Sequence, residues 1–325
     1  MIRFAVIGCG NIAQRSSIPA LLKSRITSIS VCIDNNPDKR LEILTKFNLP
    51  FEDLFEIALS KYSFEAVYIA TPTGAHKKTI LLAAAHKKHI LCEKSLASNL
   101  DDIKEIISVC KENHVGIFEG FMYQFHSNHK WINEYISSGL IGTPCIFSAK
   151  FGFPPLNKND FRYKKELGGG AILDAGAYLV HSARHFFHEE PDRIFSILEI
   201  EDEVEIRGTV LLGFPNGKSA QLGFGFNNAY QNTYSIWGTD GLIHLTRAYA
   251  LPEDFCSTVV VEKQGFKEEM KMEPCNHFIE ELKYFCSNLN NSSIIEDWYQ
   301  EAICQGTVLH KIKSQNSEYK KDRNR

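Results

Sequence analysis

The sequence has no apolar run that reaches the roughly 18 residues a membrane-spanning helix needs, and no block of basic residues outside the tail after Lys320. The formal net charge is −3. We therefore expect neither a membrane nor a nucleic acid as a partner. The first apolar run begins at Ile2, which leaves no room for a signal peptide before it. These absences predict a soluble, cytoplasmic protein.

Paired cysteines are also missing. The nine cysteines are scattered singly and include no C-x-x-C pair, which fits thiols kept reduced in the cytosol, several of them as small core residues. His126 and His129 have no third ligand at metal spacing. We therefore expect no metal site.

A chain of 325 residues is too long for one ordinary hydrophobic core, so two domains are expected. As far as about residue 120, short β-branched runs alternate with helical patterns, which predicts a doubly wound parallel sheet. The expected strands of this part are Ile2–Ile7, Ser28–Ile33, Ala66–Ala70, His89–Cys92 and Val115–Glu119, and the expected helices are Ile12–Lys23, Pro37–Phe47, His76–His86 and Leu100–Asn113.

The second half changes to strand-like runs separated by turn residues. The segments 215–217 and 239–241 are typical of hairpin turns. We expect a mainly antiparallel open sheet backed by helices near 128–138, 170–187, 275–288 and 297–313, with strands near 145–153, 193–200, 204–214, 219–226, 233–237, 242–245 and 257–262. The predicted organisation is a Rossmann domain over 1–121, an α+β substrate-binding and oligomerisation domain over 122–313, and a disordered polar tail over 314–325.

The first strand leads directly into a glycine turn and a helix start. Gly8 allows the tight turn, Gly10 lets the backbone approach a pyrophosphate, and Ala13 is small enough for close packing of helix on strand. Free amide groups at the helix N-terminus would face the anion. The spacing predicts a dinucleotide site.

Asp34 follows the second strand about 20 residues beyond the glycine turn, where an acidic side chain hydrogen-bonds the adenosine ribose. A carboxylate there disfavours a 2′-phosphate, so NAD(H) is favoured. Lys39 and Arg40 are close enough in sequence to keep NADP(H) as an alternative. Asp34 could instead cap the helix that starts near Pro37.

Five motifs follow one another in a fixed order. They are Gly8-Cys9-Gly10-Asn11-Ile12-Ala13, Ala70-Thr71-Pro72 with His76, Glu93-Lys94, Gly120-Phe121-Met122-Tyr123, and Gly168-Gly169-Gly170 leading to Asp174-x-Gly176-x-Tyr178. Together they resemble the glucose-fructose oxidoreductase, inositol dehydrogenase and MocA (Gfo/Idh/MocA) family. The resemblance covers residues 1–190 by motif and the rest by pattern. It implies hydride transfer to or from a sugar or cyclitol at a site between the two domains. The resemblance also implies which residues bind the cofactor: Gly8, Cys9, Gly10, Asn11, Ile12, Asp34, Thr71, Pro72, His76, Glu93 and Lys94.

Lys94 belongs to a motif that differs from the family's. Serine at position 95 replaces the proline of the family's E-K-P motif, which helps to fix the backbone around the lysine, in some members through a cis peptide bond. A cis bond before another residue costs about 2.5–4 kcal/mol, so Ser95 leaves that geometry open. Lys94 itself follows a strand end on the ligand side of the sheet, where an ammonium can orient a substrate oxygen and lower the pKa of a phenol. We expect Lys94 to be catalytic.

Asp174 and Tyr178 are four residues apart and would share one face of a regular helix. In the family's inositol dehydrogenases the matching pair is aspartate and an acid–base histidine. Tyrosine resembles the pattern of nucleotide-sugar ketoreductases, dihydrodiol dehydrogenases and glucose-fructose oxidoreductase. An unperturbed phenol has a pKa near 10, which suits a proton donor to a developing alkoxide once positive charge lowers it. We expect Tyr178 to be the acid, with His181 as the alternative.

Four residues are assigned to substrate binding: Tyr123, Arg162, Asp174 and His181. Arg162 lies where the family places substrate contacts and could pair with a diphosphate or a carboxylate, or lie at the surface. Tyr123 follows the last strand of the first domain and could contact substrate or serve packing. Asp174 is expected to position sugar hydroxyls.

The resulting expectation is an NAD(P)(H)-dependent sugar oxidoreductase that reduces a ring keto group of a nucleotide-linked deoxysugar, with Tyr178 as acid and Lys94 as activator. The alternatives are a dehydrogenase of a free sugar, cyclitol or dihydrodiol, and a catalytically inactive NAD(P)-binding sensor. The open sheet of the second half would expose a broad face, so a homodimer or homotetramer is expected.

Overall fold

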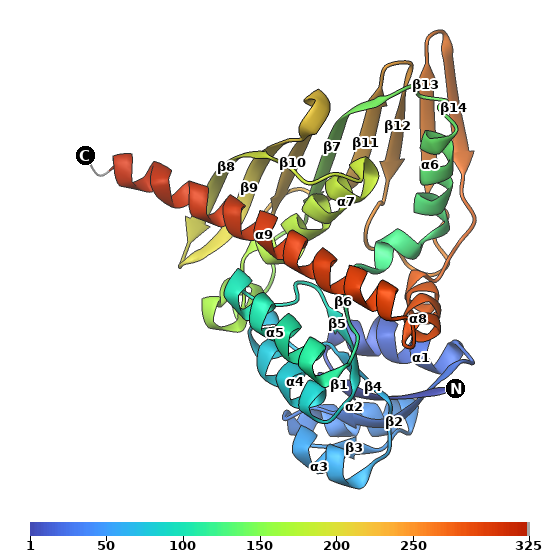
Figure 1. Cartoon of the computed structure of the whole chain (residues 1–325), viewed down its shortest axis with the longest axis vertical. Helices are drawn as coiled ribbons and strands as arrows, with labels where there is room; N and C mark the ends of the chain where they lie inside the picture. The colour runs from blue at the N-terminus through green and yellow to red at the C-terminus, as the bar shows by residue number, and fades with distance from the viewer. Residues whose placement is uncertain (324–325) are drawn as a thin grey trace. The chain divides into compact units, whose positions relative to one another are not determined.

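The computed structural model describes residues 1–323, and the chain forms two compact units that can each be followed in Figure 1. The first unit comprises Met1–Met122 and Phe278–Ile303, and the second comprises Tyr123–His277 and the chain from Cys304 onward. Unlike the expected organisation, most of α8 (His277–Asn288) and the beginning of α9 (Ser292–Arg323) fold with the first unit. α9 stays helical over 314–323, where a disordered tail was expected, and 324–325 lie outside the described residues.

The first unit is built on a six-stranded parallel sheet in the order β3-β2-β1-β4-β5-β6. This confirms the expected doubly wound sheet. Ligands of such sheets bind outside the carboxyl ends of the strands, where the strand order reverses, which here is beside β1. The strands are β1 (Ile2–Ile7), β2 (Thr27–Ile33), β3 (Phe51–Glu52), β4 (Ala66–Ile69), β5 (His89–Glu93) and β6 (Ile117–Gly120), and the helices between them are α1 (Ile18–Lys23), α2 (Pro37–Phe47), α3 (Phe55–Lys61), α4 (Thr73–Ala85) and α5 (Leu100–Asn113).

The second unit is built on an eight-stranded sheet in the order β14-β13-β12-β11-β7-β10-β9-β8. Only β7 and β10 pair in parallel, so the expected mainly antiparallel sheet is confirmed. The turns at 215–217 and 239–240 connect antiparallel neighbours, as expected. The strands are β7 (Pro144–Gly152), β8 (Arg193–Glu201), β9 (Val204–Gly213), β10 (Ser219–Gly225), β11 (Gln231–Gly238), β12 (Gly241–Thr246), β13 (Thr258–Lys263) and β14 (Phe266–Lys271).

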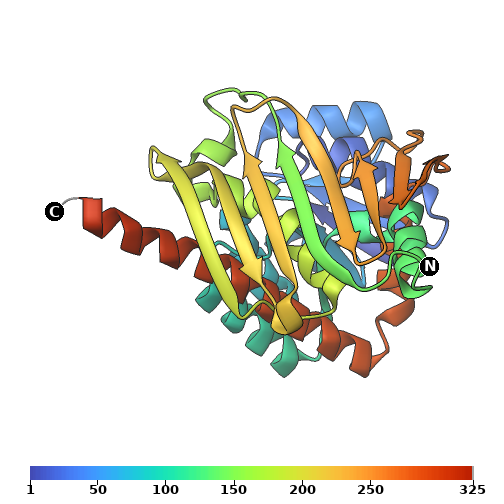
Figure 2. The same ribbon diagram turned by 90° about the horizontal axis from the view of Figure 1, so that it is seen from above.

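One face of this sheet is covered by α7 (Ala177–Phe187), which packs on β7 and β10. Every residue of α7 except His185 is buried. In Figure 2 the strands lie in front and α7 behind them. The side chains of α7 therefore belong to the core of this unit. The second unit also contains α6 (Ser127–Ser137).

Two helix starts differ from a regular helix. A π-helical turn, η1 (Ala13–Ser17), precedes α1, and another, η5 (Ile172–Gly176), precedes α7. Both lie where the sequence predicts ligand-binding segments. Such turns are rare and frequent at functional sites.

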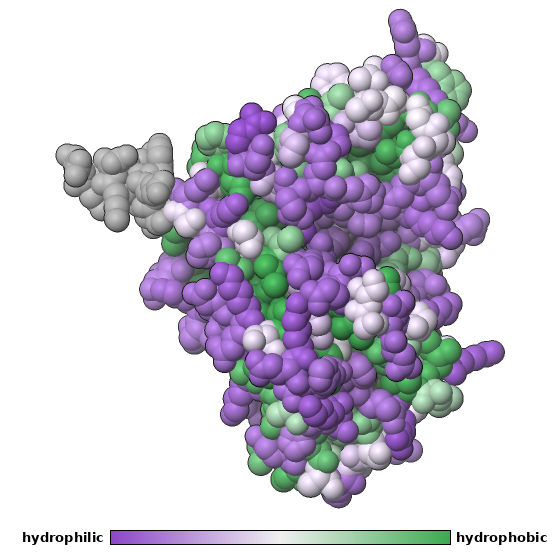
Figure 3. Space-filling view, in the orientation of Figure 1, coloured by the Kyte–Doolittle hydropathy of each residue, from purple (hydrophilic) through white to green (hydrophobic). Residues whose placement is uncertain are grey.

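No helix among residues 1–323 is both long and apolar enough to cross a membrane. On the face drawn in Figure 3, hydrophilic side chains predominate and hydrophobic ones lie scattered between them.

Candidate active site

The glycine turn after β1 leaves open space beside its backbone. A Cβ atom at Gly8 would lie 2.6 Å from the backbone nitrogen of Thr71, and the φ of Gly8 is +89°. Only glycine fits there without strain. No atom lies within 4 Å of the place that a Cβ at Gly10 would take. With Asn11 and Ile12 exposed beside it, this turn has room for a pyrophosphate, so its residues fit a dinucleotide.

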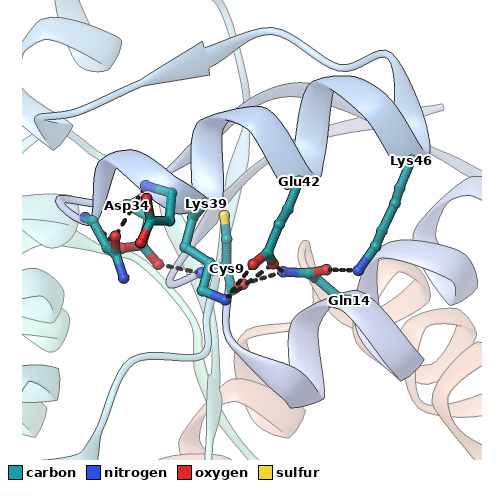
Figure 4. Close-up of polar contacts among 8 residues, drawn as sticks. Cys9, Gln14, Asp34, Lys39, Glu42 and Lys46 are labelled. Atoms are coloured by element: carbon teal, nitrogen blue, oxygen red, sulfur yellow. Dashed lines mark hydrogen bonds and ion pairs between the residues drawn. The ribbon is translucent and has the colours of Figure 1, made fainter.

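Asp34 is tied to this turn. One of its carboxylate oxygens accepts from the backbone N–H of Cys9 at 2.7 Å, and the other accepts from the N–H of Asn36 at 2.9 Å (Figure 4). The side chain of Asn36 caps α2 by accepting from the N–H of Asp38. The alternative that Asp34 is the cap is therefore wrong. Its carboxylate lies beside the glycine turn, where the ribose is expected.

A network of charged and amide groups continues from the turn (Figure 4). The amide of Gln14 donates to the carbonyl oxygen of Cys9 at 2.8 Å and to the carboxylate of Glu42. The ammonium of Lys46 donates to the Gln14 side chain at 2.7 Å, and that of Lys39 to Glu42 at 3.0 Å. Hydrogen bonds from Gln14 and Lys39 lower the pKa of Glu42. Two cations thus lie in the network beside the turn.

His76 connects the segments that follow β4 and β5. Its side chain is 1% exposed, with Nε2 2.8 Å from the carbonyl oxygen of Thr71 and Nδ1 3.0 Å from that of Ser95. Burial lowers the pKa of His76. Pro72, which follows Thr71 directly, is the N-cap residue of α4. His76 therefore positions the backbone on both sides of the expected cofactor site.

Lys94 follows β5 directly and is partly exposed. The peptide bond between Lys94 and Ser95 is cis, so serine keeps the bond geometry that the family's proline has in some members. The buried carboxylate of Glu93 accepts from the hydroxyl of Tyr68 at 2.7 Å. On the other side of the turn, the N–H of Leu96 donates to Glu119 at 2.8 Å. These contacts fix the backbone that carries the lysine.

Tyr178 stands in the first turn of α7 and is 5% exposed. Its ring lies among three other aromatic rings, those of Phe151, Tyr249 and Tyr123, at centroid distances of 5.5, 5.6 and 5.9 Å. Neither Phe151 nor Tyr249 was singled out in the sequence, because nothing in their spacing relates them to Tyr178. The ring of Tyr178 thus belongs to a buried aromatic cluster.

Tyr123 and His181 form a buried pair. The Tyr123 side chain is fully buried, and its hydroxyl lies 2.6 Å from Nδ1 of His181. Burial lowers the pKa of His181 well below its usual value. The ring of Tyr123 also contacts that of Tyr178, and the role of both residues in substrate binding stays a prediction.

Arg162 and Asp174 pair with each other. Nε of Arg162 lies 2.6 Å from a carboxylate oxygen of Asp174, and another guanidinium nitrogen lies 3.2 Å from Asp160. Arg162 was expected either to contact a ligand or to lie at the surface. In the structure it forms an ion pair with Asp174, and both side chains are partly buried. Asp174 lies in the π-helical turn η5, so its four-residue spacing from Tyr178 is not that of a regular α-helix.

The predicted residues fall into two sets. The glycine turn, Asp34, the segment after β4, Glu93 and Lys94 belong to the first unit, whereas Tyr123, Arg162, Asp174, Tyr178 and His181 belong to the second. The first set can hold a dinucleotide and present an ammonium. The second supplies a buried phenol and a charged pair.

Family models match both parts of the chain. Residues 2–121 match an oxidoreductase family with an NAD-binding Rossmann fold, and residues 129–244 match the Gfo/Idh/MocA C-terminal domain. The chain is 29% identical over 299 residues to a dTDP-3,4-didehydro-2,6-dideoxy-α-D-glucose 3-reductase from Saccharopolyspora spinosa, covering 91% of this chain and 90% of the relative. It is 30% identical over 254 residues, 75% of each chain, to a scyllo-inositol 2-dehydrogenase (NADP⁺) from Bacillus subtilis (strain 168).

Solved structures are similar over nearly the whole chain. A 3-ketoreductase from Actinomadura kijaniata in complex with NADP and TDP-benzene is 27% identical over 97% of each chain, with a TM-score of 0.90. Variants of that reductase have also been solved, one with a tyrosine replaced by phenylalanine and one with a lysine replaced by alanine. Each is 26% identical over 97% of each chain, with TM-scores of 0.91 and 0.87.

Proposed function

Since the chain belongs to the Gfo/Idh/MocA oxidoreductase family, we propose that it reduces a ring keto group of a dTDP-linked deoxysugar with NADPH, Tyr178 being the acid and Lys94 the activator. The chain is an NAD(P)-dependent oxidoreductase of CH–OH groups. The substrate class follows from the relatives, since a dTDP-sugar 3-reductase and a solved 3-ketoreductase with TDP-benzene each match more than nine-tenths of the chain.

One observation carries the choice of Lys94 and Tyr178. The lysine and the tyrosine replaced in the solved reductase lie the same number of positions apart as Lys94 and Tyr178 do here. Both variants were solved in complex with TDP-benzene and NADP. The equal spacing supports the same pair in this chain.

The proposed chemistry divides between two side chains. When bound, the reduced nicotinamide supplies the hydride. The ammonium of Lys94 donates a hydrogen bond to the carbonyl oxygen of the sugar and so stabilises the negative charge that develops there. The hydroxyl of Tyr178 gives that oxygen its proton, which completes the alcohol. The aromatic rings around Tyr178 exclude water from the phenol.

NADPH rather than NADH is proposed as the reductant. Asp34 led to an expected preference for NAD(H), but the solved reductase holds NADP and the Bacillus relative is named as an NADP⁺ enzyme. Both carboxylate oxygens of Asp34 already accept from backbone amides, and Lys39 lies in the adjoining network. We propose that Lys39 exchanges Glu42 for the 2′-phosphate. Lys39→Ala should lower the ratio of kcat/KM for NADPH to that for NADH about 10-fold or more.

Steady-state kinetics of two variants test the catalytic pair. Lys94→Ala and Tyr178→Phe should each reduce turnover of a dTDP-linked keto sugar by about 10²-fold or more while cofactor binding stays almost intact. Lys78→Ala, on the exposed side of α4, is the matched control. Near-normal turnover by Tyr178→Phe would move the acid role to another group.

The relative from Bacillus keeps a second function open, because a scyllo-inositol dehydrogenase has a similar percentage of identical residues over three quarters of the chain. A thermal-shift screen with NADPH separates the two, since a bound ligand stabilises the native state. A shift with dTDP supports the nucleotide-sugar reductase. A shift with free inositol or glucose alone would favour a polyol dehydrogenase, and turnover of none of these substrates would favour a cofactor-binding sensor.

Self-association through the open sheet is part of the proposal. Outward-facing apolar side chains on β8, β9 and β11 are exposed, with Phe195, Ile197 and Trp237 at 65, 75 and 59%. Such a surface is costly to leave in water, which supports a homodimer or homotetramer. Light scattering of the wild type and Ile197→Asp tests it, the variant being expected to dissociate.

The buried cysteines of the first unit are thiols, which supports a cytoplasmic location.

A further inference from the structure

Each turnover of the proposed reaction consumes a proton. As the carbonyl carbon gains a hydride, the O–H bond of Tyr178 breaks and the O–H bond of the product alcohol forms, which leaves a phenolate. That phenolate must regain a proton before the next turnover. Because Tyr178 is only 5% exposed, polar groups inside the second unit are candidates for the route.

Two buried routes near Tyr178 end inside the protein. The hydroxyl of Tyr249 lies 3.0 Å from that of Ser182, which in turn donates to the carbonyl oxygen of Leu179 at 3.1 Å. A peptide carbonyl does not pass a proton on. The imidazole of His129 likewise lies 2.8 Å from the carbonyl oxygen of Ala248. Neither route leads to solvent.

A third route reaches the surface along α7. The hydroxyl of Tyr123, whose ring lies against Tyr178, is 2.6 Å from Nδ1 of His181. One turn later, the ring of His185 stacks on that of His181, with centroids 6.0 Å apart and planes 14° apart. The ring of His188 follows at 6.1 Å and is exposed at the end of the helix. A series of neighbouring titratable rings, one pair of them hydrogen-bonded, therefore extends from the ring of Tyr178 to an exposed histidine.

The two inner imidazoles have the properties of proton carriers. Burial lowers the pKa of His181 well below its usual value and that of His185 to about 4. Both rings are neutral near pH 7, and a neutral imidazole carries one N–H donor and one acceptor nitrogen. The Asn133 amide lies 3.1 Å from Nε2 of His185. The contact is made by the amide nitrogen, which donates to an unprotonated Nε2, so the amide must turn its carbonyl oxygen toward the ring when Nε2 is protonated.

These rings have no evident alternative role in metal binding. Within residues 1–323, no group of three histidine, cysteine, aspartate or glutamate side chains is placed to hold a metal ion. A phenylalanine at position 181 or 185 would fill the same space, but it could neither carry a proton nor hydrogen-bond Tyr123 or Asn133.

We propose that His188, His185, His181 and Tyr123 form a proton path that returns a proton from solvent to Tyr178 after each turnover, a proposal that rests on the function proposed above. Solvent protonates His188, and a proton passes by way of His185 to His181. His181 gives a proton to the oxygen of Tyr123, which releases its own toward the phenolate of Tyr178. Ring rotation or a bridging water spans the two steps between imidazoles and the step between the two tyrosine oxygens. No redox partner beyond the nicotinamide is needed.

Pre-steady-state kinetics of His185→Phe test the path. The first turnover uses the proton already on Tyr178, so NADPH oxidation should show a burst of one equivalent per site at the wild-type rate. Later turnovers should slow about 10-fold or more in weak buffer, with kcat/KM unchanged because KM falls together with kcat. Added imidazole should restore the steady-state rate. His188→Ala is a second variant in case His185→Phe folds poorly, because His188 is exposed. It should show the same burst with a smaller loss of the steady-state rate.

Two controls and the wild type fix the interpretation. Ser182→Ala, on the same helix but on a closed route, and His244→Phe, a half-buried histidine of β12, should show no burst. A wild-type enzyme without turnover would overturn the proposed function and the path together. An active wild type beside His185→Phe and His188→Ala variants that turn over steadily at its rate would overturn the path alone. So would a first turnover slowed as much as the later ones, which would indicate a packing role.

Discussion

Replacing Glu281 with glutamine is expected to stabilise the first unit at neutral pH. Glu281 lies on α8 and is fully buried, and neither of its carboxyl oxygens has a hydrogen-bond partner among the described residues. Burial, and then the charge of Glu93, raise the pKa of Glu281 well above its usual value. The native state therefore holds a proton on Glu281 at pH values where the unfolded chain has released it.

The sign and size of the effect follow from proton linkage. Since the native state binds the additional proton, the free energy of unfolding falls as pH rises above the unfolded pKa of about 4.3. The slope is about 1.4 kcal/mol per pH unit until the native pKa is reached. Glutamine has a similar shape and does not titrate, so the variant escapes this loss. Two pH units above the unfolded pKa correspond to a difference of about 2.7 kcal/mol.

Amide hydrogen exchange of α8 and β5 as a function of pH measures this difference within the first unit. Glu280→Gln is the matched control, because Glu280 is 42% exposed and pairs with Lys283 at 2.7 Å. The difference between wild type and Glu281→Gln should be small near pH 4.5 and should widen steadily toward pH 7. A difference that does not depend on pH would refute the reasoning, since it would show that Glu281 is ionised in the native state or titrates there as in the unfolded chain.

Three further predictions concern acid and the glycine turn. Burial lowers the pKa of His129 to about 3 and that of His185 to about 4, so the unfolded chain binds more protons, and the second unit should lose stability as pH falls from about 6.5 toward those values. Hydrogen exchange of α7 measures this, and stability that is constant between pH 6.5 and 4.5 would contradict it. Gly8→Ala should destabilise the first unit by about 2–4 kcal/mol in urea unfolding, because the Cβ would lie 2.6 Å from the nitrogen of Thr71 at a positive φ. Gly10→Ala should weaken NADPH binding in calorimetry yet leave urea unfolding unchanged, since its Cβ meets no atom within 4 Å.

Local signals predicted the elements that carry them. The bounds of β1, α2 and α5 agree with those expected from the hydrophobic pattern, and in the structure Asn36 and Asn99 cap the two helices. The two-residue β3 has too few positions to show any alternation. β14 was also missed, because most of its residues are exposed and charged. It forms a strand through its pairing with β13, which local sequence does not encode.

The candidate site shows the same division. The glycine turn could be predicted because a single segment supplies the strand, the turn and the helix start. The contact between Tyr123 and His181 joins positions that are 58 residues apart, and no spacing rule links them. The π-helical turns η1 and η5 were expected as regular helix. The pattern of apolar residues does not distinguish an occasional wide turn from an α-helical one.

The ion pair between Arg162 and Asp174 changes what either residue can offer a ligand. Arg162 was expected to meet a diphosphate, but its guanidinium already faces the carboxylates of Asp174 and Asp160. The three charges sum to −1, so this cluster does not by itself attract a diphosphate electrostatically. A guanidinium has five N–H donors, so hydrogen bonding to a ligand oxygen remains open to it. Arg162 is therefore better suited to fixing the carboxylate of Asp174, which lies in the turn that leads to Tyr178, than to supplying the charge that holds a nucleotide.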